Sequence, residues 1–224
     1  MDTPEHSFMV WIISITLVIL AIFTISTLIN YFRQKKKAAL YLAFNYISFA
    51  IAMFLLLIGH YDAVIKGNTT NFYNDISMLG KSFIVLGILF NLLFHAQLAD
   101  VNRGWYYFRI ILGIALVIWI LLPSNYNYGG RSTVIMTYML MAIYGLLINL
   151  FLAISFFKLG ARIKARKKEL YSLGAGALTF LIYYFLMTIY GMTQSFFIMI
   201  ITQIVLFIAL LFYFIGIYLP KLSE

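Results

Sequence analysis

The chain has 224 residues, of which 64% are hydrophobic and 10% are charged, and its mean hydropathy is +0.97. This balance excludes an ordinary soluble domain and predicts an all-α integral membrane protein. The formal net charge is +9, but the basic residues gather beside apolar runs, so we expect no nucleic-acid binding. Cysteine is absent, which excludes disulfides and cysteine-ligated metals.

Apolar runs long enough to cross a bilayer follow one another along the chain. A polar leader at residues 1–7 precedes the first run, which is too long for a cleaved signal peptide. Pro123 ends the fourth run, and Ser132 is a candidate N-cap for the fifth. We predict a single seven-helix transmembrane domain over 1–224, with spans at about 8–32, 38–60, 75–99, 107–122, 133–157, 170–189 and 196–219.

Basic residues divide unequally between the two sides of this topology. Of the 16 Lys and Arg residues, only Lys66, Lys81 and Arg131 fall on the side of the N-terminus. The other side holds the connections after spans one, three and five and the C-terminus, and the connection KLGARIKARKKE is the most basic of them. Because positive loops stay in the cytoplasm, we predict an outside N-terminus and a cytoplasmic C-terminus in the cell membrane.

Small and polar residues mark the faces by which the spans pack, because lipid gives helices no hydrophobic reason to associate. Span one has the weaker series Thr16, Phe23, Thr27 and Asn30. Two spans carry residues at intervals of seven: Ala38, Asn45, Ala52 and Gly59 in span two, and Ser195, Thr202, Ala209 and Gly216 in span seven. Span four has no polar side chain from 110 to 122, so we expect it at the periphery and span three at the centre.

Lys81 lies roughly a turn and a half inside span three. An ionisable group at that depth is costly, which makes it a candidate site. The alternative is that Lys81 snorkels to the outer interface and meets Asp62, Asp75 or lipid phosphate. The candidate ligand-binding residues, all in the predicted outer half, are Lys81, Tyr138, Gln194, Thr202 and Gln203.

A second polar layer is predicted in the inner half. Asn45, Asn91 and Asn149 lie at similar depths in spans two, three and five, and His95 is one turn from Asn91. They form either a hydrogen-bonded network that holds the helices together or a switchable network coupled to the cytoplasmic loops.

The sequence offers little for catalysis or for metal binding. His60 and His95 fall on opposite sides of the bilayer, so they cannot share a metal ion. No nucleophile motif occurs, and all seven acids lie in loops, tails or span ends, which argues against a proton pump. We therefore expect no enzyme, no catalytic residue, no metal and no cofactor.

Seven spans with an outside N-terminus resemble the architecture of rhodopsins and G-protein-coupled receptors. Span seven lacks the lysine of a retinal Schiff base and the N-P-x-x-Y motif, and Asp100–Arg103 only echo the receptor motif at the end of span three. The topology is also similar to the seven-span sensory regions of prokaryotic signalling proteins. Since the chain ends four residues after Pro220, that resemblance implies output through a separate partner.

These observations favour a receptor-like or sensory protein that binds a small polar, anionic or amphiphilic ligand in the outer half. Its basic cytoplasmic loops would contact anionic lipid headgroups or a signalling partner. The alternative is a small-solute uniporter or channel, because a three-plus-one-plus-three helix arrangement resembles the sugar-transporting SWEET proteins. A membrane-embedded enzyme is a third possibility. Asn68 and Thr70 also form a glycosylation sequon on the predicted outside.

Overall fold

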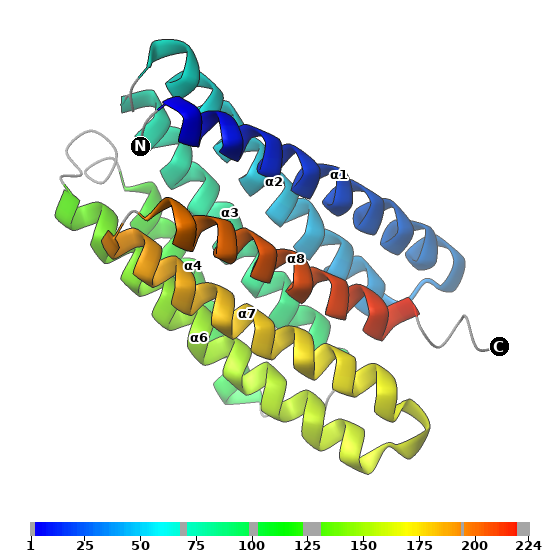
Figure 1. Cartoon of the computed structure of the whole chain (residues 1–224). Coiled ribbons are helices and arrows are strands. Elements are labelled where there is room, and N and C mark those ends of the chain that lie inside the picture. Colours follow the sequence, from blue (N-terminus) through cyan, green and yellow to red (C-terminus); the bar gives the residue numbers. More distant parts are fainter. Residues whose placement is uncertain (1–2, 68–70, 99–102, 123–130, 194, 219–224) are drawn as a thin grey trace. The chain divides into compact units, whose positions relative to one another are not determined.

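A computed structural model describes residues 3–67, 71–98, 103–122, 131–193 and 195–218. Within these ranges the chain is helical (Figure 1). The helices are α1 (Thr3–Gln34), α2 (Lys37–Lys66), α3 (Asn71–Ala96), α4 (Arg103–Leu121), α6 (Arg131–Arg162), the 3-10 helix η1 (Lys164–Arg166), α7 (Lys167–Thr193) and α8 (Phe196–Tyr218).

Seven of the described helices are long and apolar enough to cross a bilayer, which confirms the prediction of an all-α, multi-pass membrane protein at this level. The direction in which the chain crosses stays a prediction, as does the single transmembrane domain. Gln194, Asp100 and the sequon at Asn68–Thr70 lie outside the described residues.

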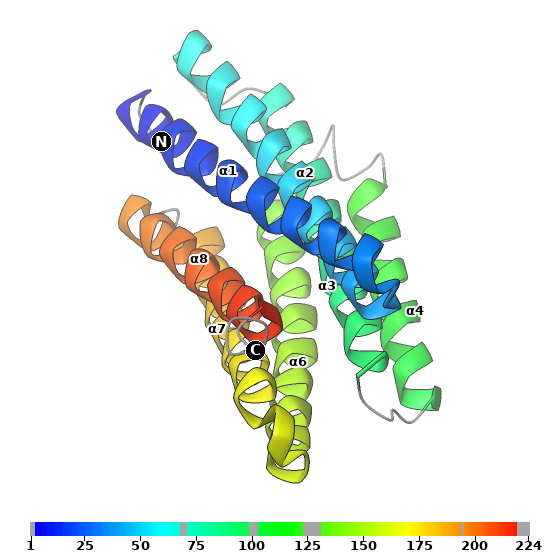
Figure 2. The ribbon, with the colours of Figure 1, turned by 90° about the vertical axis from the view of Figure 1, so that its right-hand side faces the viewer.

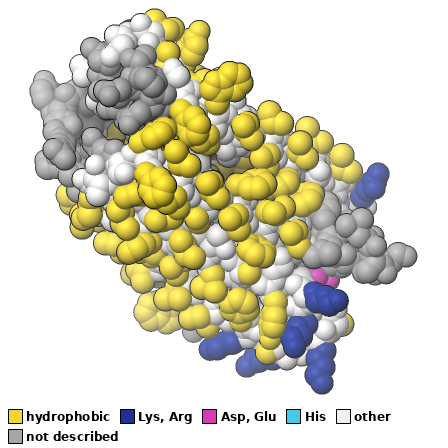
Figure 3. Space-filling view, in the orientation of Figure 1, with side chains coloured by type: hydrophobic (Ala, Val, Ile, Leu, Met, Phe, Trp, Pro, Cys, Tyr) yellow, Lys and Arg dark blue, Asp and Glu magenta, His cyan; other side chains and the backbone are white. Residues whose placement is uncertain are grey.

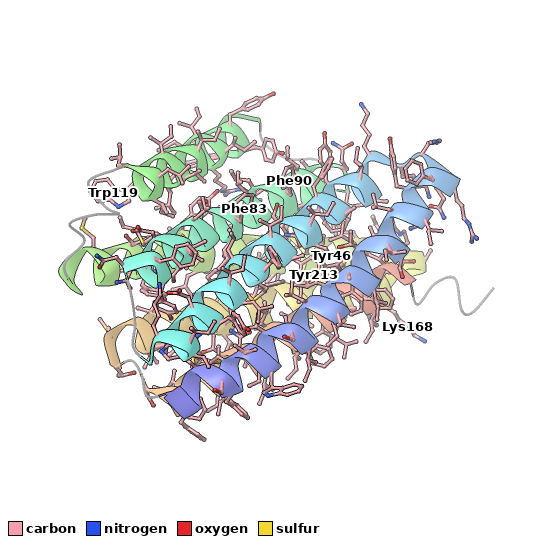
Figure 4. The ribbon with its side chains drawn as sticks, turned by 90° about the horizontal axis from the view of Figure 1, so that it is seen from above. Tyr46, Phe83, Phe90, Trp119, Lys168 and Tyr213 are labelled. Atoms are coloured by element: carbon pink, nitrogen blue, oxygen red, sulfur yellow. The ribbon has the colours of Figure 1, made fainter. Side chains whose placement is uncertain are left out.

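Two compact units divide the chain, Met1–Thr137 and Tyr138–Glu224. The first contains α1 to α4, which follow one another side by side so that each helix contacts the next (Figures 1 and 2). Viewed from above, α4 with Trp119 lies beyond α3 at the edge of this unit (Figure 4). In the most apolar stretch of each helix, 67% of the α3 residues are buried inside the protein, compared with only 17% of the α4 residues. The central and peripheral positions expected for these two helices agree with this burial.

The first helix begins earlier than predicted. Residues 3–7 belong to α1 and do not form a separate leader, because a proline is tolerated in the first turn of a helix, where backbone N–H groups have no intrahelical acceptor. The buried face of the helix recurs every three or four residues at His6, Met9, Ile13, Thr16, Leu20, Phe23, Thr27 and Asn30.

Small residues bring α2 and α3 into close contact. A Cβ atom on Gly80 would lie 3.2 Å from the carbonyl oxygen of Ala52, and one on Gly87 would lie 2.9 Å from the Phe49 ring. The amide Nδ2 of Asn45 donates a hydrogen bond of 2.7 Å to the carbonyl oxygen of Gly87. The seven-residue stripe of α2 therefore faces α3, where glycines repeat at the same interval. This interval keeps one face of each helix against the other over several turns.

The second unit contains most of α6 with α7 and α8, and it uses the same kind of contact. A Cβ on Gly176 of α7 would lie 3.3 Å from the carbonyl oxygen of Ala209, and one on Gly216 of α8 would lie 3.0 Å from that of Glu169. The hydroxyl of Ser172 donates a 2.8 Å hydrogen bond to the carbonyl oxygen of Phe212. Tyr184 of α7 packs its ring directly over Gly145 of α6. In this unit α7 therefore contacts both α6 and α8.

Apolar side chains cover the face of the molecule seen in Figure 3. On α1 the exposed apolar residues form the side opposite His6 and Ile13, and they include Trp11, Ile15, Val18, Ile22, Ile25 and Ile29. An apolar surface this extensive is expected where helices meet lipid tails.

Candidate functional site

Lys81 is buried in the first unit. Its side chain is only 4% exposed, and its ammonium donates a 3.6 Å hydrogen bond to the sulfur of Met78 one turn earlier on α3. Ser77, Met78, Ser82 and Val85 are buried around it along the same helix, which packs on more than one side. Asp62, a proposed partner for a snorkelling lysine, pairs with Lys66 on its own helix at 2.8 Å. The Lys81 side chain is therefore buried in this unit, and both its ligand-binding role and its alternative role at the outer interface stay predictions.

The other candidate ligand-binding residues belong to the second unit. The ring of Tyr138 meets that of Tyr190 edge to face, with centroids 6.3 Å apart. The hydroxyl of Thr202 donates to the carbonyl oxygen of Ile198 at 2.7 Å, which is a common local contact for threonine in a membrane helix. Gln203 is buried. Their grouping with Lys81 stays a prediction.

Asn45 of the predicted polar layer bonds to the backbone of α3 one turn before Asn91. The Asn45 side chain bonds to the carbonyl oxygen of Gly87, which is also the oxygen that the backbone N–H of Asn91 reaches in a regular α-helix. Asn91 and His95 are both buried on α3. The asparagine of α2 thus holds α3 at the turn that carries Asn91.

Asn149 lies in the second unit. Its amide Nδ2 donates a 2.8 Å hydrogen bond to the carbonyl oxygen of Gly145, one turn earlier on the same helix α6. Gly145 is also the residue over which the Tyr184 ring packs, so the bond lies beside the contact between α6 and α7. A network that joins Asn149 to Asn45, Asn91 and His95 stays a prediction.

Sequence reasoning missed a buried histidine pair. His6 of α1 and His60 of α2 face each other with their Nδ1 atoms 2.8 Å apart. The ring of Tyr73 on α3 meets both imidazoles edge to face, with centroid distances of 5.5 and 5.2 Å. The signal was the periodicity of span one: extending its buried face back by one turn from Met9 places His6 on that face.

The described residues contain no group of three or more His, Cys, Asp or Glu side chains that could hold a metal ion. Their polar contacts are between helices or within one helix, and they include the pair at His6, the bond from Asn45 and the contact at Lys81.

No protein-family model matches the chain, and neither a curated protein nor a solved structure matches it. The likeness to seven-helix receptors and sensors rests on topology alone, so a functional argument must come from this chain's own residues.

Proposed function

We propose that this chain is a receptor-like or sensory membrane protein that binds a small anionic, polar or amphiphilic ligand through Lys81. The observation that carries the proposal is the burial of this lysine inside an apolar helix. We place the N-terminus outside and the C-terminus in the cytoplasm, which puts Lys81 in the outer half of the cell membrane.

Burying the charge of Lys81 costs free energy. A lysine at the centre of a membrane helix costs about 2.5–3.5 kcal/mol on insertion scales, and intramembrane cations usually line ligand or ion pathways. The ammonium of Lys81 contacts the sulfur of Met78 at 3.6 Å. A carboxylate, phosphate or sulfate that enters beside Lys81 would gain a charge-assisted hydrogen bond in a region of low dielectric constant.

The basic segment around η1 supplies a route for output. Its exposed cations are Lys158, Arg162, Lys164, Arg166, Lys167 and Lys168. Only Glu169 offers a balancing charge there, and it pairs with Arg166 at 2.7 Å. Lys and Arg side chains gather at the end of α6 and α7 in Figure 3. Each such cation near an anionic leaflet contributes about 1 kcal/mol to membrane binding. We therefore propose that helix shifts alter the contacts of this basic segment with anionic lipid or an acidic partner.

The test is ligand-dependent thermal stability of the purified protein. We would compare alkyl phosphates and alkyl carboxylates with uncharged alcohols of the same chain length, in the native chain and in Lys81→Met. At 100 times the dissociation constant a ligand stabilises by about 2.7 kcal/mol, a shift of several degrees. The shift should vanish in Lys81→Met and persist in Lys66→Met, which removes an exposed cation. Equal responses in all three proteins would refute the site.

The second candidate is a uniporter or channel, and the helix grouping favours it. Two sets of three consecutive helices occur, α1 to α3 and α6 to α8, and in each set the middle helix contacts both of its neighbours. Along the chain, α4 follows the first set and precedes the second. This grouping is compatible with a three-plus-one-plus-three transporter. Liposomes that contain the protein and a stabilising ligand separate the two functions: a carrier moves the ligand across the membrane, whereas a receptor binds it without flux.

A further inference from the structure

Three aromatic rings from three helices meet at one end of the first unit. His6 and His60 are 1% and 3% exposed, so both imidazoles are removed from solvent and lipid. Tyr73 closes the cluster from α3 and can approach because Gly59 lies beneath it: a Cβ there would be 3.2 Å from the Tyr73 ring. The cluster connects the first turn of α1 with α2 and α3.

The distance between the two imidazoles sets what can lie between them. Nitrogen atoms 2.8 Å apart share one hydrogen, so one Nδ1 carries a proton and donates while the other is unprotonated and accepts. A metal ion would need a wider gap, since two nitrogens at about 2.0–2.1 Å from one tetrahedral zinc are roughly 3.3 Å apart. The observed geometry therefore suits a proton and not a metal ion.

We propose that His6, His60 and Tyr73 form a proton-sensitive clasp that ties the start of α1 to α2 and α3 and opens when both imidazoles are protonated. With at least one ring neutral, the hydrogen bond between the Nδ1 atoms is possible. With both protonated, each Nδ1 carries a hydrogen, so the bond is lost and two positive charges face each other. The first turn of α1 then separates from α2. This inference is independent of Lys81 and of the ligand proposed above.

Other titratable groups lie near the clasp on the same helices. On α2, Asp62 pairs with Lys66 and is two residues from His60, a step of about 200° around the helix. On α3, Asp75 is two residues from Tyr73, again a step of about 200° around the helix. The Tyr73 ring, which carries a titratable phenol, contacts both histidine rings. On α1, Glu5 precedes His6, and its side chain is outside the described part of the chain. A solvated imidazole changes its charge between about pH 5 and 8, whereas the second protonation of two buried, facing imidazoles requires a lower pH.

The absence of cysteine allows a direct measurement of the opening. Phe8 and Tyr61 are exposed neighbours of the two histidines, so spin labels on Phe8→Cys and Tyr61→Cys report the separation of α1 from α2. In lipid vesicles we expect one narrow distance distribution at pH 8 and a longer, broader one at about pH 3, because burial and the facing charge oppose the second protonation. Adding His60→Gln should abolish this pH dependence. Adding His95→Gln, which changes a buried histidine outside the clasp, or Lys81→Met should leave it intact.

A native chain whose label distances do not change with pH overturns the clasp, as does a His60→Gln chain that responds like the native one. Should His60→Gln fail to fold, the native chain still decides, because it has only three histidines. With ¹⁵N-labelled imidazoles, the clasp gives two rings coupled through a shared Nδ1 hydrogen at pH 8, and this coupling is lost at about pH 3. Rings without such coupling at pH 8 overturn the proposal.

Discussion

Two residues at the ends of α1 and α2 adopt a left-handed backbone. Gly67 ends α2 with φ of 70°, where glycine avoids the steric cost of a Cβ atom. Lys35 follows α1 with φ of 53° and carries that cost, about 1–2 kcal/mol. Its ammonium lies 5.7 and 5.2 Å from the ring centroids of Tyr31 and Phe32, and exposed cation–π contacts of about 0.5–1 kcal/mol offset part of the cost.

Gly67→Ala should therefore destabilise the protein by about 1 kcal/mol. Among the described residues, no atom lies within 4 Å of the added Cβ, so the expected loss comes from the backbone conformation of residue 67. Thermal unfolding of the purified protein measures it. Gly67→Asn is the matched control, because asparagine tolerates the left-handed region better than alanine does, and it should recover part of the loss. Equal stability of the native, alanine and asparagine proteins would contradict the argument.

The sequence predicted the burial of some individual residues and missed others. The buried series Thr16, Phe23, Thr27 and Asn30 followed from helical periodicity, and the structure buries all four. His6 was missed because a polar leader ends a hydropathy pattern, whereas the helix itself continues to Thr3. The carbonyl acceptor of Asn45 could not be predicted either, since a backbone oxygen on another helix leaves no mark in the residue pattern.

At the scale of helices, close approach through small residues determines how neighbours pack. In lipid, helix association relies largely on van der Waals contact, so a glycine that lets two backbones approach stabilises the pair through many small contacts. Gly80 against Ala52 in the first unit and Gly176 against Ala209 in the second are equivalent examples.

Gly80→Leu and Gly176→Leu should each destabilise the protein by about 1–3 kcal/mol, because overpacking pushes the helices apart. At Gly80 the first obstacle is the Ala52 carbonyl at 3.2 Å, and at Gly176 it is the Tyr213 ring at 2.6 Å, with the Ala209 carbonyl at 3.3 Å. Thermal unfolding in detergent reports both losses. Ala21→Leu, on the exposed side of α1, adds a comparable side chain outside the core and should change stability little.

The number of helices and their packing stripes could be predicted from the sequence because both depend on local periodicity. The partner of each stripe could not. The seven-residue stripes of spans two and seven are alike, yet α2 places its stripe against α3 and α8 places its stripe against α7. Such pairing depends on how side chains such as Phe49 and Tyr213 fit over particular glycines, which a one-dimensional pattern does not contain.

For the whole molecule, the distribution of charge along the sequence predicts where the membrane spans end. Basic residues gather beside the ends of spans, whereas the apolar runs between them carry little charge. Lys81 is the exception, and it is also the candidate site. The grouping into Met1–Thr137 and Tyr138–Glu224 could not be predicted from hydropathy, because the apolar runs in both units look alike.

The direction in which the chain crosses the membrane can be tested with single cysteines. The unequal distribution of basic residues predicts that the connection after α2 is outside and that those after α1 and α6 are cytoplasmic. Lys66→Cys, Lys36→Cys and Lys164→Cys place single thiols at exposed positions of a chain without native cysteine. In intact cells, a membrane-impermeant maleimide should label Lys66→Cys alone, and the other two should react only after permeabilisation. The reverse pattern would invert the orientation and place Lys81 in the inner half of the bilayer, where a ligand would have to arrive from the cytoplasm.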